Sequence, residues 1–300
     1  MAVGNRRTLA ETPLLGILRS NNNLFLRISK SEVIKVKYLV INGSARKGNT
    51  WKLAEMLKNN IAQISPESCF EDIQLIDLEL PFCTGCSLCF RKGHQYCPHY
   101  SIMKTIIDKV DECDGLIFSV TTFNMQPTAL TKNLIDHFCF MLHRPRFFNK
   151  KAIVISTVGA IGGKKTVKYL SSTLKGLGFN RCYRLLLSSY SWNDYHLDEK
   201  AKRKCKQLAR KFHKDVSSSK IYAPSFAVLI PYNLFRGMGI WYAKGTEYET
   251  EDGAYWTKPQ RAKYVYDSSI PVTLIKRLFG NALFHLGRIA GKFVTVTYKK

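Results

Sequence analysis

From residue 37 onward, short apolar runs alternate with amphipathic segments along the chain. The apolar runs predict strands at residues 37–42, 73–78, 115–119, 151–157 and 182–188. Apolar residues recurring every three or four positions predict helices at residues 50–65, 102–110, 127–140, 166–177 and 198–216. Such alternation is typical of α/β proteins. We therefore predict a doubly wound, five-stranded parallel sheet with helices on both faces.

The two ends of the chain break this alternation. We predict a poorly ordered N-terminal arm at residues 1–36, one domain at residues 37–216 and a basic C-terminal extension at residues 217–300. Across residues 273–294 of the extension, apolar residues recur at helical spacing with basic residues and no acidic residue between them. This pattern predicts an amphipathic helix. Contact with an anionic membrane surface and docking onto the domain or a sister subunit both explain the pattern. Its apolar positions are Ile275, Leu278, Phe279, Ala282, Leu286, Ile289 and Phe293.

The charge of the chain is strongly basic. Lys and Arg number 46 against 22 Asp and Glu, a formal net charge of +24. Such a charge attracts phosphorylated ligands, anionic lipids and polyanions alike. Eight basic residues lie between residues 200 and 214, where a solvated helix face is the plain interpretation and an anionic partner the alternative. Nucleic acid is not expected as a partner, because no recognition motif accompanies the charge.

Targeting signals do not stand out in the sequence. The early apolar run at residues 14–18 is too short for the core of a signal peptide, so export is not expected. No uncharged apolar stretch approaches the roughly twenty residues that a membrane-spanning helix needs. We predict a cytoplasmic protein with peripheral contact to a membrane surface.

The loop between the first predicted strand and helix reads GSARKGNT, residues 43–50. A strand-to-helix turn presents backbone N–H groups and the positive end of the helix dipole to an anion. Ser44, Asn49 and Thr50 add side-chain donors, and Arg46 adds charge. The loop lacks the Gly-Lys-Ser/Thr ending of a P-loop and two glycines of the dinucleotide fingerprint. A mononucleotide phosphate is the favoured ligand, and an ordinary turn with a threonine cap is the alternative.

Four of the nine cysteines crowd into fifteen residues: Cys83, Cys86, Cys89 and Cys97. The other five are scattered, so no disulfide framework is indicated and reduced thiols are expected. The spacing suits a [4Fe–4S] cluster, which needs four thiolates. Zinc held by the cysteines, or with His94 or His99 as a ligand, is one alternative, and unmetallated thiols or a redox pair is another.

Four segments in order resemble NADPH-dependent FMN reductases and the related iron–sulfur flavoproteins. They are GSARKGNT, CTGCSLC, LTKNLIDHF and HRPRFFNKKAIVIST, and the resemblance covers residues 38–188. It implies a flavodoxin-like fold, with FMN at the carboxyl edge of the sheet and hydride supplied by NADPH or NADH.

The resemblance also implies which residues bind FMN. Ser44, Arg46, Asn49 and Thr50 would hold the phosphate. Two later loops would flank the ribityl chain and the flavin ring, and no side chain is expected to act as a catalytic acid or base, because the flavin carries the chemistry. His137 and His143 are accordingly predicted to be packing or capping residues. The residues of the two later loops are Thr121, Thr122, Phe123, Asn124, Met125, Thr157, Gly159 and Gly162.

The chain departs from the family pattern at one point. The family usually has Pro and Tyr after the third strand, where this chain reads SVTTF at residues 119–123. Phe123 is therefore the aromatic residue expected to stack on the flavin.

Together these features predict an FMN-dependent NAD(P)H oxidoreductase. Electrons would leave through an iron–sulfur cluster, to a redox protein, or directly to a quinone, nitro compound or ferric acceptor, and the protein would form a homo-oligomer. The alternatives are a flavoprotein electron carrier or redox sensor without nicotinamide turnover, and a polyanion-binding module that has kept only the fold.

Overall fold

The computed structural model describes residues 10–20, 23–33, 35–190 and 197–294, with the backbone alone for residues 10–33. Five parallel strands form the central sheet in the order β4-β3-β5-β8-β9. This order confirms the predicted doubly wound, flavodoxin-like sheet. The strands are β3 (Lys37–Asn42), β4 (Cys69–Gln74), β5 (Gly115–Ser119), β8 (Lys151–Val158) and β9 (Arg181–Ser188).

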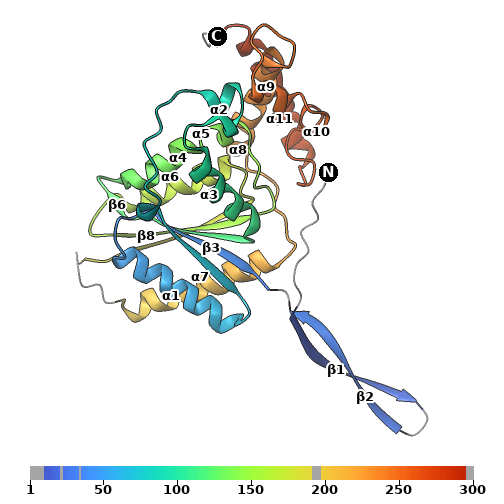
Figure 1. Ribbon diagram of the computed structural model, residues 1–300. Coiled ribbons are helices and arrows are strands. Elements are labelled where there is room, and N and C mark those ends of the chain that lie inside the picture. Colours follow the sequence, from blue (N-terminus) through green and yellow to red (C-terminus); the bar gives the residue numbers. More distant parts are fainter. Residues whose placement is uncertain (1–9, 21–22, 34, 191–196, 295–300) are drawn as a thin grey trace.

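Helices cover both faces of the sheet (Figure 1). Alternate residues of β3 enter two different cores, because successive side chains of a strand point to opposite faces. Leu39 and Ile41 pack in one core with α3, α4 and α6, whereas Tyr38 and Val40 pack in the other with α1 and α7. These helices are α1 (Asn49–Ile64), α3 (Tyr100–Glu112), α4 (Ala129–His137), α6 (Gly163–Gly176) and α7 (Glu199–Ser217).

The second strand differs from its prediction. We expected residues 73–78, but β4 ends at Gln74 and a 3₁₀ turn, η1 (Leu75–Leu78), follows. The partner strand sets this end, because β3 stops at Asn42, which pairs with Gln74. The apolar pattern of the strand continues through η1. These residues do not extend β4, because β3 has ended and offers them no hydrogen-bond partner.

The third predicted helix also differs. Pro127 was expected in its first turn, but it pairs with Thr122 in a two-residue ladder between β6 (Thr122–Phe123) and β7 (Gln126–Pro127). The helix α4 begins after Thr128, whose side chain caps it by accepting from the Thr131 N–H. A separate short helix, α5 (Cys139–His143), completes the predicted span.

The N-terminal segment was predicted to be a poorly ordered arm. Its described part forms an antiparallel hairpin of β1 (Ala10–Ser20) and β2 (Asn23–Val33), which projects from the rest of the chain in Figure 1. Poor order in this arm remains a prediction. The proposed boundaries between arm, domain and extension remain a prediction.

The C-terminal extension docks against the sheet domain near the cysteine segment. Its elements are α8 (Phe226–Met238), η3 (Gly239–Tyr242), α9 (Glu251–Trp256), α10 (Pro259–Ala262) and α11 (Leu274–Gly291). Leu229, Tyr232 and Trp256 form a third core that includes Phe148 of the sheet domain. The cysteine segment contains α2 (Leu88–Arg91) and η2 (His94–Tyr96), and α9 packs against α2.

The helices α8 and α11 touch through glycines. A Cβ atom added to Gly237 would lie 2.2 Å from the Phe284 carbonyl oxygen, and one added to Gly287 would lie 2.4 Å from the Leu234 carbonyl oxygen. Only glycine fits at such a distance, because real Cβ atoms do not approach backbone atoms below 3.0 Å.

We predict that Gly287→Leu destabilises the extension by about 2–3 kcal/mol, the usual cost of overpacking a close contact. The matched control is Ala282→Leu, because Ala282 lies on the exposed side of the same helix. Thermal and urea unfolding of both variants tests this. Equal stability of the two would show that α8 and α11 do not pack through Gly287.

Candidate functional site

A cavity of about 570 Å³ opens at the carboxyl ends of the strands. Ten of the twelve residues predicted to bind FMN line it, and they come from the loops after β3, β5 and β8. Met125 and Gly162 lie beside the cavity and are not on its wall, and the binding role of all twelve stays a prediction. The lining residues are Ser44, Ala45, Arg46, Gly48, Asn49, Thr50, Thr121, Thr122, Phe123, Asn124, Thr128, Thr157, Gly159 and Ser189.

Hydroxyl groups join the three loops across the floor of this cavity. The Thr50 and Thr157 hydroxyl oxygens are 2.6 Å apart, and the Ser44 and Thr121 oxygens are 2.7 Å apart. A further contact of 3.2 Å links Thr50 with Thr121. Because a hydroxyl both donates and accepts, this cluster can turn its protons toward an anion without leaving a buried group unpaired.

The N-terminus of α1 faces the same cavity. Gly48 is the N-cap, and the first turn of the helix contains no acidic residue. The helix dipole is therefore not neutralised by a side chain, and Arg46 adds positive charge on the cavity wall. This donor set fits a phosphate monoester such as that of FMN.

The loop after β5 has an unusual backbone. Asn124 and Met125, at the turn between β6 and β7, have φ angles of +46° and +65°. Such angles are uncommon for residues with side chains and are found at tight hairpin turns. Gly162 packs against this turn, since a Cβ added to it would lie 2.7 Å from the Met125 Cα. Phe123 is left 54% exposed at the cavity, where a planar ring can reach it.

Sequence analysis missed the residues that hold the loop of residues 43–50 from behind. The Gly43 carbonyl accepts hydrogen bonds from the hydroxyls of Thr128 and Thr131, and a Cβ on Gly43 would lie 2.0 Å from the Thr131 Oγ1. Thr131 belongs to the LTKNLIDHF segment, so the motif marked the position but not its role. Ser189, directly after β9, also lines the cavity. Sequence analysis did not predict this position, because no sequence pattern marks the loop after an edge strand.

We predict that Thr50→Val weakens FMN binding about tenfold, since it removes a buried hydroxyl from the cavity. The control is Thr105→Val, which removes an exposed hydroxyl of α3 that bonds only to its own helix. Titration of apoprotein with FMN, followed by flavin fluorescence, measures both affinities. Equal affinity in the two variants would mean that the phosphate binds elsewhere.

The four predicted cluster ligands lie on the wall of a second pocket. Cys83, Cys86, Cys89 and Cys97 line it together with Cys139, and all five thiols are free. Within the described part of the chain, no three His, Cys, Asp or Glu side chains converge at metal-binding distance. Cys139, one of the five scattered cysteines, joins the pocket because it lies in α5, whose Phe140 also lines the wall.

The chemistry of this donor set suits a cation. Burial raises the pKa of the Cys97 thiol, and the negative charges of Cys89, Cys86 and Cys83 raise it further. A metal centre bound here would favour the deprotonated form of these thiols, because its positive charge offsets the repulsion between thiolates. A hydrogen bond with Cys139 raises the pKa of Cys89, which favours its protonated form in the absence of a metal.

Asn133 of α4 fixes the start of the cysteine segment. Its side-chain amide donates to the carbonyls of Leu80 and Pro81 at 2.9 and 3.1 Å, and its oxygen accepts from the Cys83 N–H at 3.1 Å. The Asn133 side chain is buried, so these bonds are shielded from water. The first cysteine is thus anchored to the sheet domain.

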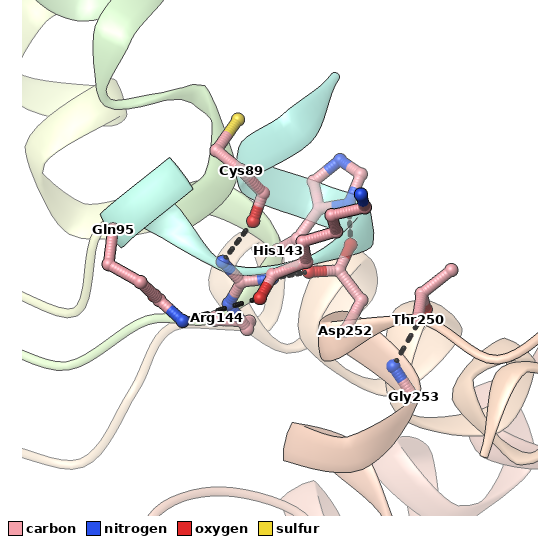
Figure 2. Close-up of polar contacts among 8 residues, drawn as sticks. Cys89, Gln95, His143, Arg144, Thr250, Asp252 and Gly253 are labelled. Atoms are coloured by element: carbon pink, nitrogen blue, oxygen red, sulfur yellow. Dashed lines mark hydrogen bonds and ion pairs between the residues drawn. The ribbon is translucent and has the colours of Figure 1, made fainter. Parts of the chain in front are cut away.

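Arg144 joins the cysteine segment to the C-terminal extension (Figure 2). It is buried, donates to the Cys89 carbonyl at 2.6 Å and forms an ion pair with Asp252 of α9. His143 also contacts Asp252, with 2.8 Å between the Nδ1 and Oδ2 atoms. The second predicted packing histidine, His137, contacts the Asn133 carbonyl and His99.

We predict that Asp252→Asn destabilises the protein by about 2–3 kcal/mol, since Arg144 would keep a buried charge without its carboxylate. Hydrogen exchange in residues 83–97 should increase at the same time. The control is Asp108→Asn, which breaks an exposed pair with Lys104 of the same helix. Equal stability and equal exchange in the two variants would contradict the coupling.

Comparison with known proteins agrees with the motifs. The family model for NADPH-dependent FMN reductase matches residues 36–186. An iron–sulfur flavoprotein of Clostridioides difficile (strain 630) is 28% identical over 174 residues, which cover 58% of this chain and 76% of that protein. An iron–sulfur flavoprotein of Archaeoglobus fulgidus is 34% identical over 101 residues, 34% of this chain and 48% of that protein. The resemblance predicted from the sequence motifs is confirmed.

Two solved structures are similar to part of this chain. An NADH:FMN oxidoreductase is 20% identical, with a TM-score of 0.47 over 61% of this chain and 91% of its own. An FMN-dependent NADH-azoreductase of Bacillus anthracis, in complex with FMN, is 15% identical, with a TM-score of 0.45 over 59% of this chain and 98% of its own. None of the helices in the described part of the chain combines the length and the apolar composition that crossing a lipid bilayer requires.

Proposed function

Since the chain belongs to the NADPH-dependent FMN reductase family and is an FMN-dependent NAD(P)H oxidoreductase, we propose that its FMN lies in the 570 Å³ cavity. Reducing equivalents from NADPH or NADH would then pass to an iron–sulfur centre held by the cysteine segment. The observation that carries this proposal is the hydroxyl cluster of Ser44, Thr50, Thr121 and Thr157 beside the N-terminus of α1.

In this proposal the protein binds and orients, while the flavin, when bound, accepts hydride and releases electrons. Ser44, Thr50 and the α1 N-terminus would hold the phosphate, and Arg46 would balance its charge. The turn at Asn124 and Met125 would keep its strained backbone against the ring, with Phe123 as the aromatic neighbour. Strain of this kind persists where surrounding contacts fix it and is common at binding sites.

We propose a [4Fe–4S] cluster as the next carrier, with Cys83, Cys86, Cys89 and Cys97 as ligands. Four thiols on one pocket wall support this, as does the similarity to proteins named iron–sulfur flavoproteins. Zinc or unmetallated thiols are the alternatives. The final acceptor would be a redox protein or a small molecule such as a quinone, a nitro compound or ferric iron, and a homo-oligomer is the proposed assembly.

The spectrum of the purified protein tests the flavin part of the proposal. Protein loaded with FMN should be yellow, and NADPH or NADH should bleach it anaerobically. Yellow protein that neither nucleotide bleaches would instead indicate an electron carrier or sensor. Protein that binds no FMN at all would contradict the proposed function.

The cysteine site has a separate test. We predict that Ala at any one of Cys83, Cys86, Cys89 or Cys97 abolishes iron binding after anaerobic reconstitution, because a four-thiolate site needs all its ligands. The control is Cys69→Ala, since Cys69 lies in β4 outside the pocket. Iron and sulfide analysis and FMN content are the measurements. Wild-type protein without iron, or a Cys97 variant with full iron content, would overturn the cluster assignment.

A further inference from the structure

The helix α11 uses only one of its faces for packing. Gly280, Gly287 and Gly291 are its buried residues. At about 100° per residue these glycines lie on one side of the helix, the side that touches α8 and η3. Phe279 and Phe284 pack beside the glycines, against Phe226 and Arg236 of α8. The other large apolar side chains of the helix lie away from this contact.

An apolar stripe runs along the opposite side of α11. Five large apolar side chains and the exposed Ala282 between them follow one another at three- or four-residue spacing, and they point away from the glycine face. Large apolar side chains this exposed are unusual on a folded protein, and a contiguous row of them marks an interaction site. The exposed fractions are 71% for Ile275, 64% for Leu278, 56% for Leu286, 57% for Ile289 and 81% for Phe293.

Basic residues flank this stripe. Arg277, Arg288 and Lys292 are exposed and lie on one side of it, and Lys276 lies on the other. Residues 268–300 contain six Lys or Arg residues and no Asp or Glu. An apolar row bordered by cations alone is the pattern of helices that lie in the interface of an anionic bilayer.

We propose that α11 binds the surface of an anionic lipid bilayer, with its apolar stripe among the acyl chains and its basic residues at the headgroups. The α8–α11 glycine contact would hold the stripe outward. A second copy of the chain is a poorer occupant, because a symmetric contact through α11 would bring two sets of cations together with no acidic residue on either helix.

The proposal is independent of the flavin chemistry but bears on where it happens. The helix α9 of the extension packs against α2 of the cysteine segment, and both lie at the same end of the molecule (Figure 1). Membrane binding through α11 would bring this end of the protein toward the lipid surface.

Vesicle flotation of the full-length, FMN-loaded protein tests the proposal. Wild-type protein should float with vesicles of phosphatidylcholine and about 30% phosphatidylglycerol and should not float with phosphatidylcholine alone. The double variant Leu286→Ser, Ile289→Ser should bind the anionic vesicles at least tenfold more weakly, because it removes apolar area from the lipid contact. The control Ile64→Ser, Ile76→Ser changes two exposed isoleucines outside the extension and should bind as wild type does.

Two double variants that lose the same charge distinguish binding through α11 from attraction by the net charge of the protein. Arg288→Gln, Lys292→Gln should weaken binding about 30-fold, since each basic residue at an anionic surface contributes roughly a fivefold factor. Arg210→Gln, Lys211→Gln makes the same change of net charge on α7 and should have less than a threefold effect, because α7 would not lie at the surface. An unchanged circular dichroism spectrum and FMN content show that each variant is folded.

Three results would overturn the proposal. The first is a failure of the wild-type protein to bind anionic vesicles. The second is an equal loss of vesicle binding in the α11 variants and their controls, which would indicate attraction by net charge alone. The third is unchanged vesicle binding by the α11 variants together with loss of a dimer in light scattering. That outcome would assign the stripe to a second copy of the chain.

Discussion

Parallel pairing of β3 with its two neighbours is the constraint on which both sites depend. Asn42, the last residue of β3, pairs with Gln74 of β4 and with Ser119 of β5. The three strands therefore end together. The loop of residues 43–50, the path to the cysteine segment and the loop with Phe123 all begin at this edge of the sheet. The Gly43 N–H bond to the Ser119 carbonyl, 2.8 Å long, holds the first residue of the loop of residues 43–50 to the neighbouring strand.

The cysteine segment depends on contacts from outside the sheet. Asn133 anchors its beginning, and Arg144 holds the carbonyl of its third cysteine while pairing with Asp252 of the extension. A buried guanidinium needs both a carboxylate and acceptors for its N–H groups, so these contacts are costly to break singly. The extension is thereby tied to the cysteine pocket as well as to the third core.

The same extension leaves an apolar row uncovered. The helix α11 contacts α8 through its glycines together with Phe279 and Phe284, and five other large apolar side chains remain exposed. Because close helix contact through glycine needs no large apolar surface, docking and membrane binding can use different sides of one helix.

The five-stranded sheet and most of the residues on the wall of the proposed FMN cavity could be predicted from the sequence, because apolar periodicity and turn residues act over short stretches of chain. GSARKGNT and the residues after the third and fourth strands predicted ten of the residues on the cavity wall. Tertiary structure decided what short stretches do not contain. The end of β4 depends on the length of β3, Cys139 joins the cysteine pocket from α5, and Thr131 supports Gly43 from a segment 88 residues away. The exposure of the α11 stripe also depends on tertiary structure. Periodicity reveals an apolar face, but only packing decides which face of the helix is covered.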